Sequence, residues 1–256
     1  PGTALIFLSY YLVLHIVGLP SFYMNIFVAS ISIFIVTIFF GRENVLLIAS
    51  LIFFLTLIIS IYKGFQKRRL IFIGLVSLIF IFSVDFIFNN LFEQRHRDRF
   101  NIVLGLDKDL KGIGYNTNQS QLAFKSGGLL GEGFLKGSQT KGNFIPEQHS
   151  DYIFTTIGEE WGFIGSLLTV IIFTFLLLRI IDRTYNQRNL FYKIYSYCVA
   201  TIIFFHFAIN ISMVIGVFPS VGIPLPFISY GGSSMLAFTI LFAGYIKIDA
   251  NKKEKW

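Results

Sequence analysis

The stretch Ser126–Phe154, SGGLLGEGFLKGSQTKGNFIPEQHSDYIF, decides how this chain folds. It is polar and rich in glycine, yet it lies between two long apolar runs, 70–92 and 152–181. It ends with three ionisable side chains, Glu147, His149 and Asp151, at the start of the second run. Because ionisable groups are costly inside lipid and usually functional there, this placement predicts chemistry at a membrane surface.

The composition predicts the fold class. The chain has 256 residues, of which 54% are hydrophobic and only 14% charged, and its mean hydropathy is +0.69. Soluble domains are about 25% charged, so we expect an all-α, polytopic transmembrane helical bundle. The net charge of +7 comes largely from Lys and Arg in short connectors and the C-terminal tail, a membrane pattern that gives no reason to expect a nucleic-acid partner. The single cysteine, Cys198, excludes an intrachain disulfide.

About seven apolar segments have nearly the length needed to cross a hydrocarbon core, which takes about 20 helical residues. The first is short, and the chain begins almost directly in it, so we expect a fragment that lacks an N-terminal portion. The predicted spans are 4–18, 22–40, 45–62, 70–92, 152–181, 192–218 and 229–248.

The basic residues predict the orientation of these spans. Lys and Arg are enriched in the connector 63–69, in the connector 182–191 and in the tail 252–255. Alternating spans place all three on one side, and the positive-inside rule makes that side the cytoplasm. The long loop 93–151 is then extracytoplasmic.

This loop has the composition of a folded segment. Nine of the 22 glycines lie between Gly105 and Gly142, but apolar residues recur among them. Loops this long are usually functional or disordered. We expect a loop that caps the bundle, with a short amphipathic helix at Asn116–Phe124.

Asp151 is the first candidate for chemistry, and its position allows two interpretations. Ser150 or Asp151 could cap the following helix, because side-chain oxygens accept from the free N–H groups there. Alternatively, Asp151 is a general base, desolvated enough to raise its pKa yet reachable by a polar substrate. Both interpretations stay open at this stage.

Glu147, His149 and Asp151 also form an alternating set of the kind that divalent cations prefer. The pattern is weak without a ligand from elsewhere in the chain. Transient assistance by Mg²⁺ or Mn²⁺ is therefore a candidate role, and no metal ligand set is assigned.

Further polar groups lie within or beside the apolar segments. Glu159 and Glu160 are either functional or paired with a loop cation such as Arg97 or Arg99, whose guanidinium groups also suit phosphate. Asp85 lies in the fourth span and needs a polar neighbour. His206 and Asn210 share a helical face, which favours interhelical hydrogen bonds over ligand contacts.

The segment Phe218–Ser234, FPSVGIPLPFISYGGSS, carries three prolines that prevent a continuous helix. It stays apolar, so we expect a re-entrant or interfacial segment. Ser229–Ser233 opens the last helix, where free N–H groups attract anions such as pyrophosphate. Close helix packing at Gly231 and Gly232 is the alternative explanation.

Together these motifs resemble the shape, elongation, division and sporulation (SEDS) family of integral membrane proteins, the RodA and FtsW type, and look closer to RodA. The resemblance covers roughly 93–250 and rests on separated motifs in order. They are Gly114-Tyr115, Gln119-Ser120, Ser126-Gly127-Gly128, Gly131, Gly133, Gln139, Pro146-Glu147, His149, Asp151-Tyr152-Ile153-Phe154, Glu159-Glu160, Gly162, Asn210, Gly222–Pro226 and Ser229–Ser233.

The resemblance implies a peptidoglycan glycosyltransferase of the bacterial cytoplasmic membrane that polymerises lipid II during cell-wall elongation and cell-shape maintenance, together with the elongation or division machinery. It implies a multi-pass protein whose active site faces outward, with a class B penicillin-binding protein as partner and the nascent glycan strand as second ligand. Asp151 would be the catalytic base. The substrate-binding candidates are Glu147, His149, Gln139, Arg97, Arg99, Glu160, Ser229, Gly231, Gly232 and Ser233.

Some features depart from the family pattern. Pro1-Gly2-Thr3 looks like the remnant of a longer motif, four apolar segments precede the loop where two are expected, and Tyr152 replaces a more usual Phe. Two alternatives remain: a transporter of lipid-linked precursors that uses Asp85, His206 and Asn210 as its pathway, and a non-catalytic scaffold for a penicillin-binding protein.

Overall fold

The computed structural model describes residues 2–21, 23–34, 36–37, 40, 44–45, 67–105, 112 and 114–251, with the backbone alone for 2–9, 67–75 and 77. These residues divide into two units, 1–19 with 99–256 and 20–98. The predicted span 45–62, Lys63 and the tail 252–256 lie outside the described residues, apart from Val45.

The regular structure of the described residues is helical throughout, as the sequence predicted. The second unit contains the helical residues 23–34, α3 (Lys67–Phe86), the π-helical turn η1 (Ile87–Leu91) and the start of α4 (Gln94–Val103). The first unit contains α1 (Gly2–Val17), α5 (Tyr115–Gly127), α6 (Ser138–Lys141), α7 (Ile153–Glu160), α8 (Gly162–Tyr185), α9 (Leu190–Ile215) and α10 (Gly232–Ala250).

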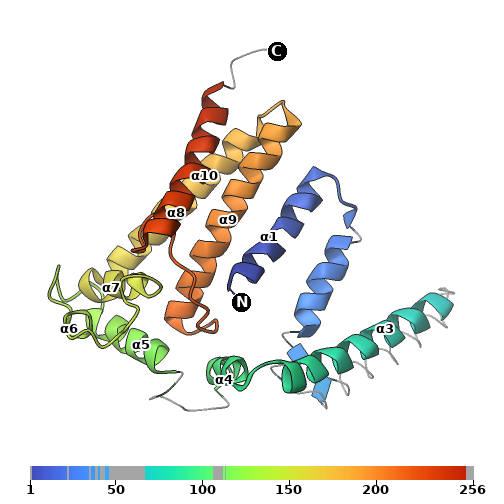
Figure 1. The fold of residues 1–256 in the computed structure, drawn as a ribbon, viewed down its shortest axis with the longest axis horizontal. Helices are drawn as coiled ribbons and strands as arrows, with labels where there is room; N and C mark the ends of the chain where they lie inside the picture. The colour runs from blue at the N-terminus through green and yellow to red at the C-terminus, as the bar shows by residue number, and fades with distance from the viewer. Residues whose placement is uncertain are drawn as a thin grey trace. The chain divides into compact units, whose positions relative to one another are not determined.

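Within the first unit, α8 and α10 both pack against α9, and α5, α6 and α7 gather at one end of this group (Figure 1). Among the described residues, α8, α9 and α10 are long and apolar enough to cross a membrane. They correspond to three of the predicted spans. The total of about seven spans stays a prediction.

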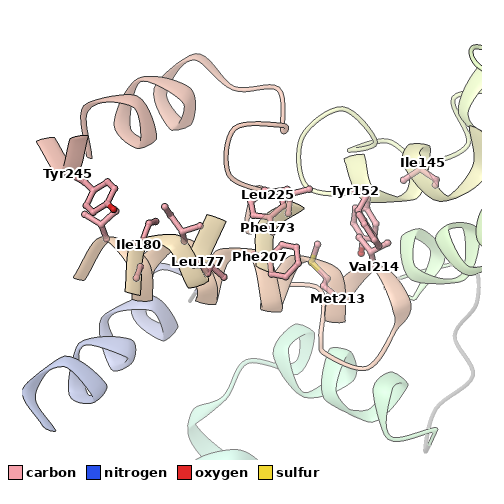
Figure 2. Packing of buried hydrophobic residues seen from close by; sticks show 14 residues of the cluster. Ile145, Tyr152, Phe173, Leu177, Ile180, Phe207, Met213, Val214, Leu225 and Tyr245 are labelled. Atoms are coloured by element: carbon pink, nitrogen blue, oxygen red, sulfur yellow. The ribbon is translucent and has the colours of Figure 1, made fainter. Parts of the chain in front are cut away.

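The core of the first unit lies between α8 and α9. Phe173, Leu177 and Ile180 recur at helical spacing on one face of α8, and this face packs against a buried stripe on α9. Phe173 and Phe207 stack with ring centroids 4.6 Å apart. Figure 2 shows the same cluster continuing from Tyr245 of α10 to Tyr152 at the opposite end. Residues of the loop 93–151 therefore share one core with the membrane helices.

The end of α9 is closed by α5, the helix that the sequence predicted at Asn116–Phe124. Gly216 takes the left-handed conformation (φ 87°) that stops α9. The last carbonyls of α9 then accept from α5: Ser120 Oγ donates to Val214 O at 2.9 Å, and Gln121 Nε2 donates to Ile215 O at 3.0 Å. These bonds fix α5 across the end of the bundle, because they satisfy carbonyls that the helix itself leaves open.

The predicted span 152–181 differs in the structure, where it is broken into α7 and α8. Gly162 adopts φ +65°, a conformation that only glycine takes without strain. The break frees the carbonyls of Glu159 and Glu160 and the N–H groups of Phe163 and Ile164. A continuous helix was predicted because the segment 152–181 is apolar overall, although Glu159 and Glu160 interrupt it.

The glycine-rich segment 127–133 satisfies both sides of this break. Glu132 N and Gly133 N donate to the Glu159 and Glu160 carbonyls at 2.9 and 3.0 Å. In return, Phe163 N and Ile164 N donate to the carbonyls of residues 128 and 129 at 2.9 and 3.2 Å. So close an approach leaves no room for side chains: a Cβ on Gly131 would lie 2.1 Å from Glu160 O.

This packing yields a stability prediction. Gly131→Ala should lower the free energy of unfolding by about 1–3 kcal/mol, the usual cost of overpacking, and strain at φ +81° should add to it. Gly232→Ala is the matched control, because a Cβ there meets nothing within 4 Å. Thermal unfolding of both variants in detergent measures the difference. Equal melting temperatures would contradict the proposed role of the segment.

Candidate active site

Asp151 lies directly before α7, and its carboxylate is not used to cap that helix. The N-cap of α7 is Tyr152, without a side-chain capping bond. Ser150 Oγ donates instead to Glu147 Oε2 at 2.9 Å. The capping interpretation is therefore wrong for both residues. The half-buried Asp151 carboxylate faces Gly222, where an added Cβ would lie 3.1 Å from Oδ2.

The main chain around Asp151 is held by three hydrogen bonds at successive carbonyls. Tyr230 N donates to His149 O at 2.8 Å. Ser229 Oγ donates to Ser150 O at 2.5 Å, and Asn210 Nδ2 donates to Asp151 O at 2.7 Å. Two of the donors belong to the proline-rich segment and the third to α9. This clamp fixes the backbone of Asp151 and leaves its carboxylate available for chemistry.

Asn210 is the centre of the clamp. Its side chain is fully buried, and the same Nδ2 group also donates to Ile223 O at 2.7 Å. One amide therefore joins the loop 93–151 to the proline-rich segment. The sequence predicted interhelical hydrogen bonds for Asn210 and His206. The structure corrects this, because both bind the irregular backbone beside α9, His206 through Nδ1 to Pro224 O at 3.3 Å.

The proline-rich segment folds inward as a re-entrant segment would. Ile223 and Leu225 are 2% and 1% exposed. Side chains satisfy its backbone: Leu225 N donates to Ser229 Oγ at 2.7 Å, and Arg99 Nη1 donates to Ser220 O at 2.6 Å. Irregular backbone among apolar helices requires such partners. Ser229, predicted to bind substrate, has its hydroxyl engaged with protein backbone on both sides.

The electrostatic surroundings of Asp151 favour its protonated form. Burial raises the pKa of Asp151 above its ordinary value, and the negative charge of nearby Glu147 raises it further. Glu147 itself is exposed. A carboxylate with a raised pKa is a better proton acceptor once it is ionised, so these surroundings suit a general base.

His149 is also exposed, and it lines a shallow pocket of about 210 Å³ together with Ile153, Ile228 and Tyr230. Within the described residues, no three His, Cys, Asp or Glu side chains gather as a metal site requires. Glu147, His149 and Asp151 thus do not form a preassembled ligand set. Assistance by Mg²⁺ or Mn²⁺ stays a prediction.

Glu159 is a buried acid whose structural role the sequence did not reveal. Its fully buried carboxylate accepts from Gln139 N at 2.6 Å and from Thr140 N at 2.8 Å, and also from the Thr140 hydroxyl. Sequence reasoning proposed a loop Arg or Lys as its partner. The actual partners are the free N–H groups of α6, whose N-cap, Gly137, has no side chain to offer. The absence of a capping side chain at Gly137 was the sequence signal that could have predicted an acceptor for α6 from elsewhere in the chain.

The other predicted substrate-binding residues are dispersed. Glu160 is 5% exposed beside Glu159, and Gln139 lies in α6. Arg99 supports the proline-rich segment as described above. Arg97 belongs to the second unit, where it donates to Asn89 O at 2.8 Å. Gly231, Gly232 and Ser233 form the start of α10, two of them exposed.

Asp85, for which the sequence gave no partner, accepts a hydrogen bond from Asn89 Nδ2 at 3.0 Å, one helical turn further on. Both residues belong to the second unit. Asp85 is thereby satisfied within its own segment of chain.

The comparison with protein families decides the relationship of this chain. A family model for FtsW, RodA and SpoVE, described as cell cycle proteins, matches residues 3–254. The chain belongs to this family. It is a multi-pass membrane protein, as the apolar helices α8, α9 and α10 indicate. The expectation that it is a fragment stays a prediction.

Individual relatives agree with the family assignment. Peptidoglycan glycosyltransferase MrdB of Escherichia coli K12 is 30% identical over 234 residues, which cover 91% of this chain and 62% of MrdB. Peptidoglycan glycosyltransferase RodA of Treponema pallidum is 33% identical, covering 61% of this chain and 36% of that protein. The chain thus spans less than two thirds of the length of these relatives.

A solved structure supports the fold. This structure is of a peptidoglycan synthase complex and concerns how polymerization and crosslinking are structurally coordinated. One of its chains is similar with a TM-score of 0.56 and 24% identity, over 77% of this chain and 53% of that one. At this identity the likeness concerns the fold alone.

The clamp yields a prediction for Asn210. Asn210→Ala removes the donor of two carbonyls and should destabilise the protein by about 2–6 kcal/mol, since each unsatisfied group costs about 1–3 kcal/mol. Asn186→Ala is the control, because exposed Asn186 also donates through Nδ2 to a backbone carbonyl, that of Asp182. Chemical unfolding in detergent compares the two. Equal losses would show that the two bonds to Asn210 do not carry the clamp.

Proposed function

We propose that the chain is the catalytic part of a peptidoglycan glycosyltransferase that polymerises lipid II, with Asp151 as the general base. The observation that carries the proposal is the state of Asp151. Its backbone is clamped, its carboxylate makes no hydrogen bond among the described residues, and its pKa is raised by burial and by Glu147. Family membership and the glycosyltransferase names of the relatives supply the reaction class.

In the proposed reaction, Asp151 takes the proton from the sugar 4-hydroxyl of an incoming lipid II. The hydroxyl oxygen forms a new bond to the anomeric carbon of the growing glycan strand. The bond from that carbon to undecaprenyl pyrophosphate breaks, with inversion of configuration, and the pyrophosphate leaves with the electron pair. One positioned base contributes about 10²–10⁴-fold to such a transfer.

The departing diphosphate needs positive charge or N–H donors. The start of α10 is the candidate, since the main chain leading into it is tied to the catalytic loop by the Tyr230 N to His149 O bond. The exposed residues Gly232 and Ser233 follow there. Arg97, Arg99, Glu147, His149, Gln139 and Glu160 remain further candidates for substrate contacts.

The proposal also specifies the membrane face on which the reaction occurs and the partner protein. The charge distribution of the sequence supports an active site on the outer face of the bacterial cytoplasmic membrane. A class B penicillin-binding protein is the proposed partner, in elongation or division, because the similar solved chain comes from a peptidoglycan synthase complex.

The part of the chain that the structure describes offers no observation that supports the transporter alternative. It required Asp85, His206 and Asn210 as a polar pathway. His206 and Asn210 are instead bonded to the proline-rich segment, and Asp85 accepts from Asn89. These bonds give each side chain a structural partner.

Substitution of the base tests the proposal. Asp151→Asn keeps the shape of the side chain but removes its basicity, so lipid II polymerisation by the purified full-length protein with its partner synthase should fall about 10²–10⁴-fold. Asp182→Asn, an identical change at an exposed position of α8, should leave the rate unchanged. Gel analysis of the glycan product measures both.

Equal product from wild type and a folded, partner-bound Asp151→Asn variant would place the base elsewhere. Polymerisation by neither protein, together with transport of the lipid-linked precursor by both, would favour the transporter. A variant that loses product but still supports partner activity would exclude a purely scaffolding role.

The surroundings of Asp151 also predict a pH dependence. A base must be ionised, so the rate should fall as the pH drops through the raised pKa of Asp151. Glu147→Gln removes a nearby negative charge and lowers that pKa, so the acidic limb of the pH–rate profile should move to lower pH. The midpoint of the limb is the readout, since it does not depend on the absolute rate.

Salt provides the control for this prediction. Because Glu147 is exposed, its influence is screened by ions. Raising the ionic strength should move the wild-type midpoint in the same direction and should hardly affect the Glu147→Gln midpoint. An identical profile for the two proteins at low salt would refute the coupling.

A further inference from the structure

An apolar patch stands exposed on the glycine-rich segment of the outer loop. It consists of Leu129, Leu130, Phe134, Leu135 and Trp161, whose side chains are 71%, 78%, 67%, 68% and 56% exposed. Large apolar side chains that lie exposed together on one short segment indicate an interaction surface. The active site described above does not use them.

The patch is part of the folded structure. Gly131 N donates to Gly127 O at 2.7 Å, and the bonds from residues 132 and 133 to the end of α7 hold the segment on both sides. The rings of Phe134 and Trp161 lie 6.2 Å apart. The side chains therefore face outward although their backbone is fixed by hydrogen bonds.

The patch adjoins the surface of α8. Ile164 N in the first turn of α8 donates to Leu129 O at 3.2 Å. From that turn onward α8 exposes a series of large apolar side chains and is long enough to cross a membrane. They include Phe163, Ile164, Leu167, Leu168, Ile171 and Ile172, which are 45–58% exposed.

The length of α8 sets the depth of the patch. Its 24 residues extend about 36 Å at 1.5 Å per residue, which exceeds the roughly 30 Å hydrocarbon core. The first turn and the adjoining loop then lie in the interfacial layer. Trp and other aromatic side chains are enriched in that layer, which suits the paired rings of Phe134 and Trp161.

We propose that this patch is a membrane anchor that inserts into the bilayer interface at the N-terminal end of α8. The lipid that covers the exposed face of α8 continues over Leu129, Leu130, Phe134 and Leu135. The anchor fixes the depth of the glycine-rich segment, and through Glu159 also that of α6. This proposal depends on the membrane helices and does not require Asp151 to be the base.

Labelling at Leu130 tests the anchor. In a Cys198→Ala background, Leu130→Cys and the control Lys141→Cys, exposed in the same loop, receive an environment-sensitive fluorophore. The protein is reconstituted in phosphatidylcholine–phosphatidylglycerol vesicles. At position 130 we expect blue-shifted emission, strong quenching by lipids spin-labelled near the headgroup and weak quenching by aqueous iodide. At position 141 we expect the reverse.

Two results would overturn the proposal. Equal iodide quenching at both positions would place the patch in water. Protection of position 130 from both iodide and spin-labelled lipid would show that a protein surface or a second copy covers it. Leu135→Cys, at a similarly exposed position, repeats the test if Leu130→Cys does not fold.

The native tryptophans give an independent measurement. Trp161 and Trp256 are the two tryptophans of the chain, so Trp256→Phe leaves Trp161 as the sole emitter. Lipids brominated near the headgroup should quench its emission more than lipids brominated deep in the acyl chains. Absence of quenching by either lipid would contradict the anchor.

Discussion

The side-chain amide of Asn210 donates two hydrogen bonds that hold the structure around the candidate active site together. Its partners are the carbonyls of Asp151 and Ile223, which belong to separate irregular segments. Among apolar helices each such carbonyl would otherwise be left without a donor, at a cost of several kcal/mol in lipid. The donor that α9 supplies therefore adds a shared anchor to the two direct bonds, from Tyr230 and Ser229, by which the proline-rich segment holds the loop 93–151.

The break between α7 and α8 obeys the same constraint. There the glycine-rich segment donates to the carbonyls at the end of α7 and accepts from the N–H groups at the start of α8. Glu159 extends the principle to α6, where its carboxylate replaces the missing cap. In each place a polar group from another part of the chain completes backbone that its own segment leaves open, so the helices and the irregular segments depend on one another.

This dependence explains what the sequence could and could not predict. Composition and apolar run length were sufficient for the helical membrane class, and local pattern was sufficient for α5, which the structure extends to Tyr115–Gly127. The break at Gly162 was missed, although Glu159 and Glu160 interrupt the apolar run there, because the positive φ of Gly162 depends on the glycine-rich segment that packs against it. The partners of Asn210 and Glu159 lie 13 to 59 and 19 to 21 residues away, and no local periodicity encodes such pairings.

The proposed role of Asp151 as a base sets two opposing requirements for its position. A base gains proton affinity when it is desolvated, but desolvation also reduces the fraction that is ionised. Complete burial would leave the carboxylate protonated and out of reach of a polar acceptor, and full exposure would give it the pKa of free aspartate. A half-buried carboxylate next to Gly222 meets both requirements, because the missing side chain leaves room beside it. Since the clamp binds only main-chain carbonyls, it can hold this position without neutralising the carboxylate that we propose to react.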